Sequence, residues 1–125
     1  IDAPIDRHPK EDHRFAVVAT GKASITHYEV IEYYRSVSLV KVELETGRTH
    51  QIRVHFSALG HPLVGDTTYG ADPVLGKKMG MSRPWLHALE LRFNHPVSAL
   101  PLVLSAPYPP DLQASLALLS EAVLP

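Results

Sequence analysis

Four side chains that could bind an anion or move a proton crowd into residues 47–60. They are Arg48, His50, Arg53 and His55. A helix beginning here would add free N–H groups and a positive partial charge at its N-terminus. Arginine makes planar two-point contacts, so the segment suits a phosphate, or a carboxylate from elsewhere in the fold. A solvated basic helix end with surface ion pairs fits the same spacing, and the spacing alone does not separate these interpretations.

Residues 49–59 are predicted to form the helix that positions these side chains. Apolar residues recur there at helical spacing, at Ile52, Phe56 and Leu59. Thr49 is the predicted N-cap, and Gly60 suits the position just past the helix end. Arg53 falls on a different face from the apolar residues, so it can leave the core and reach a cleft.

Other chemistries have weaker signals in this chain. A metal site is not expected, because there is no cysteine and no H-E-x-x-H motif, and His50 and His55 are five residues apart, where helical ligand pairs prefer four. Phosphate-loop, nucleophile-elbow and dinucleotide motifs are also absent. A small hydrolase would need a nucleophile near His50. The hydroxyl groups available there stand in no recognisable elbow, at Thr46, Thr49 and Ser57.

The segment GDTTYG, residues 65–70, is interpreted as a structural turn containing Gly65, Asp66 and Tyr69. Gly65 and Gly70 would supply the turn geometry, and Asp66 would cap local backbone N–H groups. This structural interpretation is preferred over a nucleophile or metal loop.

The flanking segments predict an α+β fold with a mainly antiparallel sheet, one embedded helix and a C-terminal helix. Residues 1–13 read as an irregular arm and residues 71–83 as a flexible surface loop. An antiparallel meander is predicted over residues 14–45, with Val40, Val42 and Leu44 facing inward. Further strands are predicted at residues 86–93 and 101–107. The closing helix, residues 109–124, would pack through a stripe at Leu112, Leu116, Leu119 and Val123.

Composition sets broad limits on function. The chain has 125 residues, 45% hydrophobic and 20% charged, which suits a single globular domain. No apolar run is long enough to span a bilayer, and the absence of cysteine is compatible with a cytoplasmic location. The formal net charge of −1 does not by itself indicate a nucleic-acid partner, although a local basic patch can still attract one.

The run LETGRTHQIRVHFSALGHPLVGDTTYG, residues 44–70, resembles the RluA-type RNA pseudouridine synthases. That family carries L-x-T-G-R-T-H-Q-I-R-V-H, a short helical run and then G-x-P-x-x-G-D. Other segments resemble the family as well, so the likeness covers essentially the whole chain. They are APIDRHP, GKASITHYEV, RPWLHALELRFNHP and APYPPDL.

The resemblance implies an enzyme that isomerises uridine to pseudouridine in ribosomal or transfer RNA, without cofactor or metal. The target base would be flipped into a pocket, and an aspartate would act at its sugar. Arg53 is expected to pair with that aspartate and hold it ionised. Leu86 is expected to form an apolar wall under the uracil, and Arg48 and His50 to support the site or meet the RNA backbone.

One departure from the family is evident. The family's aspartate lies in an upstream H-R-L-D motif, and no Arg-Leu-Asp occurs here. Asp66 occupies another family position. Residues 1–125 are therefore interpreted as the C-terminal portion of the catalytic domain, a fragment that starts at Ile1, is inactive alone and has the missing N-terminal half as a partner. An uncovered sheet edge and apolar surface would follow. The alternative is a non-catalytic RNA-binding module.

Overall fold

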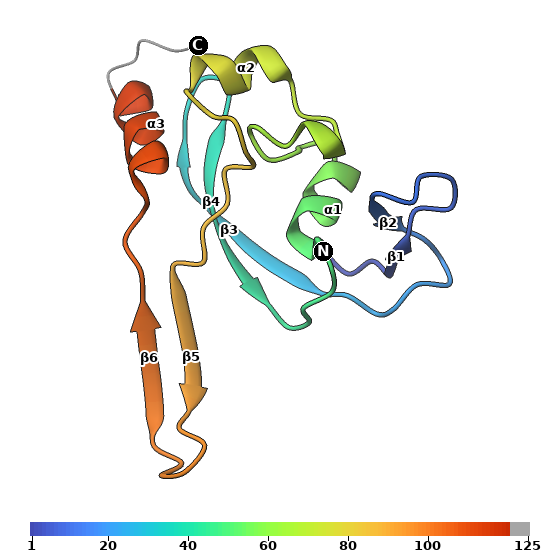
Figure 1. Ribbon diagram of the computed structural model, residues 1–125, viewed down its shortest axis with the longest axis vertical. Coiled ribbons are helices and arrows are strands. Elements are labelled where there is room, and N and C mark those ends of the chain that lie inside the picture. The colour runs from blue at the N-terminus through green and yellow to red at the C-terminus, as the bar shows by residue number, and fades with distance from the viewer. Residues whose placement is uncertain (121–125) are drawn as a thin grey trace.

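Three separate antiparallel strand pairs make up the sheet structure of residues 1–120, the part that the computed structural model describes (Figure 1). Strand β1 (Ile5–Arg7) pairs with β2 (Phe15–Val17), β3 (Thr26–Tyr33) with β4 (Ser38–Leu44), and β5 (Glu90–Asn94) with β6 (Pro101–Ser105). The helices are α1 (Gln51–Ala58), the 3-10 helix η1 (Thr67–Tyr69), α2 (Pro73–Lys78) and α3 (Pro110–Ser120). The predicted α+β class is confirmed.

The N-terminal segment is built into the fold, so the prediction of an irregular arm is wrong. Ile5 is only 2% exposed. It pairs with Val17 on one side and forms a bridge to Lys22 on the other. Gly21 permits this approach, because a Cβ there would lie 2.6 Å from the backbone of Ile5. Local sequence did not show β1, since two prolines and many charges surround a single buried isoleucine.

The predicted meander over residues 14–45 is also wrong in its pairing. After β2 the chain turns at Gly21 and returns alongside β1, so β2 and β3 are not paired. β3 and β4 form their own hairpin with a bulge at Ile31, between the pairs Val30–Val40 and Glu32–Leu39. Of the residues expected to face inward, Val40 and Val42 are half-buried, whereas Leu44 is exposed.

Helix α1 lies between the β1–β2 hairpin and β3 (Figure 1). Its N-cap is His50, not Thr49, and His50 has a left-handed φ of 53°. Gly60 has φ 84° just past the helix end, as predicted. The buried face differs from the predicted apolar stripe, since Leu59 is 46% exposed. The buried face of α1 includes polar residues, since it consists of Gln51, Val54, His55 and Phe56.

Residues 71–83 are ordered by packing, which corrects the prediction of a flexible loop. Asp72 caps α2 by accepting a hydrogen bond from the N–H of Val74. Met79 and Met81 then pack against Leu112 of α3, which is fully buried. The glycines and lysines made this segment look mobile. The sequence alone does not show that its two methionines are buried and anchor it.

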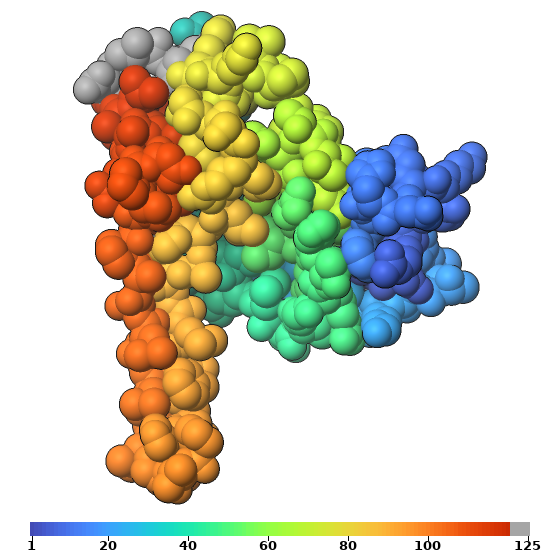
Figure 2. All heavy atoms as spheres, in the orientation of Figure 1, coloured from blue at the N-terminus to red at the C-terminus, as the bar shows by residue number. Residues whose placement is uncertain are grey.

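The β5–β6 hairpin projects from the body as an arm that continues into α3 (Figures 1 and 2). The predicted α3 stripe is buried at Leu112 and half-buried at Leu116 and Leu119; Val123 lies outside the described residues. None of the helices within residues 1–120 is long and apolar enough to cross a membrane.

Candidate functional site

Arg53, from the first turn of α1, forms a two-point ion pair with Asp66. Arg53 Nε donates to Asp66 Oδ2 over 3.0 Å, and Arg53 Nη2 donates to Asp66 Oδ1 over 2.8 Å. The Asp66 side chain is 1% exposed, and that of Arg53 is 20% exposed. These hydrogen bonds raise the pKa of Arg53 above its usual value, although burial opposes the shift. The carboxylate partner that the spacing suggested is therefore found within this chain.

Asp66 does not play the capping part that the turn motif suggested. It precedes η1, but its side chain caps no backbone N–H of that helix. The turn itself is confirmed, because Gly65 and Gly70 have φ values of 82° and 95°. The capping prediction failed because the half-buried Arg53 takes both carboxylate oxygens of Asp66, which a local turn pattern cannot reveal.

Tyr69, which also belongs to the predicted turn, lies with its ring under the same guanidinium. Its ring centroid is 4.8 Å from Arg53 Cζ, a distance suited to a cation–π contact. The Tyr69 hydroxyl accepts a hydrogen bond from the N–H of Phe15 at 3.0 Å, and its carbonyl accepts one from Ser57 Oγ at 2.7 Å. Arg53 is thus held at one edge by Asp66, with its charge placed over the ring of Tyr69.

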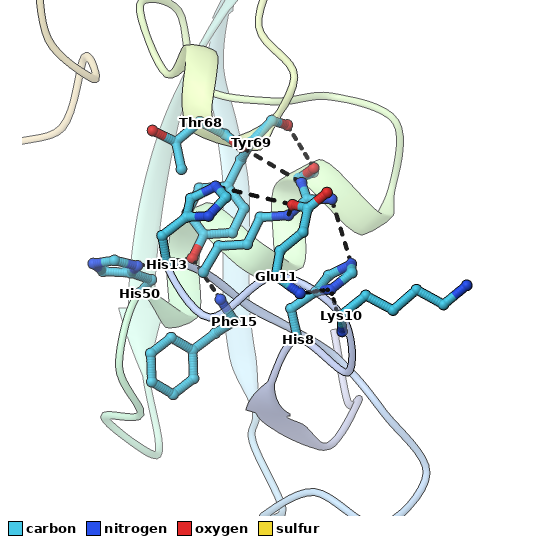
Figure 3. Close-up of polar contacts among 10 residues, drawn as sticks. His8, Lys10, Glu11, His13, Phe15, His50, Thr68 and Tyr69 are labelled. Carbon is cyan, nitrogen blue, oxygen red and sulfur yellow. Dashed lines mark hydrogen bonds and ion pairs between the residues drawn. The ribbon is translucent and has the colours of Figure 1, made fainter.

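His50 reaches Tyr69 from the start of α1, and Figure 3 shows these two side chains. Its Nδ1 lies 2.8 Å from the hydroxyl of Tyr69, and its ring meets Phe15 and Tyr69 edge-on. Burial lowers the pKa of His50 below 6.5, and the charge of Arg53 lowers it further, while Asp66 opposes the shift. His50 is therefore neutral near pH 7. Its backbone is left-handed, with φ 53°, which is a strained conformation for a residue other than glycine.

Arg48 and Leu86 are not joined to this cluster by the contacts of residues 1–120. Arg48 donates through Nε and Nη2 to the carbonyl of Ala23, at 3.1 and 3.0 Å, and so ties the turn before α1 to the segment that precedes β3. The carbonyl of Leu86 accepts a hydrogen bond from Arg83 Nη1 at 3.3 Å. Arg83 is itself paired with Asp111 at the start of α3. The role expected for Leu86 in a uracil pocket stays a prediction.

A buried polar network lies under α1, and the sequence pattern did not indicate it. His55 is fully buried; its Nδ1 lies 2.7 Å from Thr26 Oγ1, and its Nε2 lies 2.8 Å from the carbonyl of Ala3. Gln51 donates to Thr26 Oγ1 and accepts from Thr46 Oγ1. The one available signal was that Gln51 and His55 are four residues apart, on one helix face. Hydrophobic periodicity does not register a polar face that is buried.

Within residues 1–120, no group of three or more histidine, aspartate or glutamate side chains is placed to hold a metal ion.

Comparisons with known proteins agree with the residue pattern. A family model described as RNA pseudouridylate synthase matches residues 1–58. An uncharacterized RNA pseudouridine synthase of Mycobacterium bovis is 52% identical over 119 residues, which are 95% of this chain and 39% of the relative. The ribosomal large subunit pseudouridine synthase D of Xanthomonas campestris is 44% identical over 129 residues, covering 96% of this chain and 39% of that protein.

The fold leads to the same group of proteins. The solved structure of human RNA pseudouridylate synthase domain containing 1 superposes with a TM-score of 0.73 at 36% identity, over 92% of this chain and 51% of that one. The arrangement of strands and helices is therefore that of part of a pseudouridine synthase domain. The chain belongs to the RluA-type family of RNA pseudouridine synthases, and it spans about 39% of the length of the curated relatives that it matches.

Proposed function

We propose that this chain is the part of an RNA pseudouridine synthase that supplies Arg53 to the active site. The whole protein isomerises specific uridines in RNA, and the name of the Xanthomonas relative makes ribosomal RNA the first substrate to test. The observation that carries the proposal is the held guanidinium of Arg53 within the motif that matches the family. A guanidinium that is fixed at one edge and placed over an aromatic ring can receive a second planar acceptor at its free N–H groups.

In this proposal the acceptor is the carboxylate of the aspartate expected upstream. Arg53 would keep that carboxylate ionised and aimed at the sugar of a flipped uridine. His50, neutral and rigid beside Arg53, supports the site or meets the RNA, and Leu86 lines the base pocket. The reaction breaks the N1–C1′ bond and forms a C5–C1′ bond; the hydrogen on C5 leaves as a proton, and N1 takes up a proton, so the product is an isomer of the substrate. It needs no oxidant, reductant or metal.

We infer that residues 1–125 alone form no pseudouridine, since the Arg-Leu-Asp motif of the family does not occur among them. A protein extended upstream by the missing half is expected to be active. Both proteins are incubated with ribosomal RNA transcripts carrying tritium at C5 of uridine, and the tritium released to water is counted. Release by the extended protein and none by the chain alone is the expected result.

Arg53→Ala tests the site within the extended protein. Tritium release should fall at least about 100-fold, the scale at which a misplaced reacting group costs rate. Arg35→Ala is the matched control, because Arg35 is exposed and makes no ion pair among residues 1–120, and it should keep parental activity. An extended protein that binds RNA but releases no tritium from any transcript would favour the non-catalytic binding module.

A further inference from the structure

Asp66 is too deeply buried and too well fixed to be only a turn residue. Its carbonyl accepts hydrogen bonds from the N–H groups of Tyr69 and Ala71, and its own N–H donates to the carbonyl of Leu63. The preceding Gly65 is pressed so closely on the chain that a Cβ there would lie 2.2 Å from the carbonyl oxygen of Arg83. The carboxylate is therefore held by a turn that has little freedom to move.

This fixed carboxylate uses only one edge of the Arg53 guanidinium. A guanidinium has five N–H donors, and Asp66 takes one on Nε and one on Nη2. Three donors remain: both on Nη1 and the second on Nη2. None of them has a hydrogen-bond partner within residues 1–120. Asp66 fixes the Nε–Nη2 edge, and Arg53 Cζ lies 4.8 Å from the centroid of the Tyr69 ring, so the remaining fork points away from the Asp66 edge.

We propose that Asp66 is a positioning residue for the synthase: it locks the Nε edge of Arg53, so that the Nη1–Nη2 fork receives the carboxylate of the upstream aspartate in one orientation. This inference rests on the proposed function. Asp66 touches neither RNA nor the reacting atoms in this arrangement; it acts through Arg53. Arg53 then bridges two carboxylates, one permanent and buried, the other catalytic.

If Arg53 bridges two carboxylates, removing the charge of Asp66 should change the pKa of the second carboxylate. A purely structural role for Asp66 would not lead to this expectation. The titratable groups facing Arg53 are Asp66 and Tyr69 from the η1 turn and His50 from the start of α1. The negative charge of Asp66 offsets part of the Arg53 charge. Removing it leaves the second carboxylate with a stronger cationic partner, which favours its ionised form. The acid limb of the kcat/KM profile should then move to lower pH.

The first measurement uses this chain itself and requires no activity. In the parent, the Nε–H signal of Arg53 in a nitrogen-15 NMR spectrum should be shifted and protected from solvent exchange. Asp66→Asn should return it to the position and exchange rate of the exposed arginines. Asp72→Asn is the matched control, because asparagine caps α2 as aspartate does, and the Arg53 signal should not change. A signal that exchanges freely in the parent would overturn the locked edge.

The second measurement uses the extended protein on RNA. Asp66→Asn should lower kcat about 10- to 100-fold while KM changes less than about two-fold, and should move the acid limb to lower pH. If this variant fails to fold, Asp66→Glu keeps the charge but displaces the guanidinium, so kcat should fall with the acid limb in its parental place. A kcat and a pH profile unchanged by either variant would overturn the inference. A parent that forms no pseudouridine would instead overturn the proposed function, whatever the NMR result.

Discussion

His50 is a strained residue whose protonation is disfavoured by its surroundings. The left-handed backbone, with φ 53°, places its ring between Phe15 and Tyr69 and beside the charge of Arg53. Burial is the largest cause that lowers its pKa below 6.5. A group whose pKa is lowered by folding binds fewer protons in the folded chain than in the unfolded one. Its contribution is therefore complete above pH 6.5 and is lost as the pH falls through the lowered pKa.

The pH dependence of stability should accordingly change in the variant His50→Asn. Asparagine tolerates a left-handed backbone and does not titrate. The parent should lose stability as the pH falls from 7.5 to about 5, and His50→Asn should lose less over the same interval, as measured by urea midpoints. His61→Asn serves as the control, because His61 is exposed and its ring makes no hydrogen bond among residues 1–120. Parallel curves for parent and His50→Asn would contradict the prediction.

At the residue scale, the success of a prediction from the sequence depended on how near in sequence the interacting partner of the residue lies. Arg53 was expected to pair with a carboxylate from elsewhere in the fold, and the structure supplies one in Asp66, thirteen positions away. The upstream aspartate that the family resemblance implies remains a prediction. Gln51 and His55 were missed as buried residues, because the groups that satisfy them lie on β3 and near the N-terminus.

At the scale of elements, the predictions that rested on local signals were the most successful. Alternating apolar residues and short turns gave β3 and β4, and the Gly60 signal gave the end of α1. β6 lies within the strand predicted at residues 101–107, whereas β5 begins only at Glu90, so residues 86–89 of the strand predicted at 86–93 form no strand. α2 and β1 were missed, because Met79, Met81 and Ile5 are buried by contacts distant in sequence. Periodicity reports the face of an element, but it does not report which strand will be its neighbour.

The turn between α1 and η1 should be the element most sensitive to a single methyl group. Gly65→Ala forces a side chain into a left-handed position, which costs about 1–2 kcal/mol, and into the carbonyl of Arg83 at 2.2 Å. Gly60→Ala meets the same backbone penalty, with φ 84°, but no atom lies within 4 Å of its Cβ. Urea unfolding should show a larger loss for Gly65→Ala than for Gly60→Ala.

The same pair of variants bears on the site, because Gly65 directly precedes Asp66. If the added methyl group shifts the turn, the protection of the Arg53 Nε–H signal should be lost in Gly65→Ala and kept in Gly60→Ala. Equal losses of stability in the two variants would mean that the turn relaxes around the methyl group. The turn would then not hold Asp66 as firmly as its close contacts indicate.

The whole molecule leaves much apolar surface uncovered. The β5–β6 hairpin exposes side chains on both faces and has no further strand at either edge within residues 1–120. Large apolar side chains there are more than half exposed, at Leu91, Val97, Leu100, Val103 and Leu104. Tyr33 and Ile31 at the far end of β3 are exposed as well. A two-stranded hairpin is marginal in water without a covering layer, and exposed patches of this kind mark interaction surfaces.

The chain alone is therefore expected to self-associate, and the protein extended upstream is expected to be a monomer whose added half covers the hairpin. Light scattering coupled to size-exclusion chromatography, at low and high concentration, measures both. Replacing the opposed pair Leu91 and Leu104 with lysine should dissociate the chain, because each lysine places a charge on the apolar face and the two repel each other across the strands. Ser98→Lys, at the exposed hairpin tip, should leave association unchanged. A stable monomer of the unaltered chain at every concentration would mean that the hairpin is stable without a cover, and the argument from its exposed surface would fail.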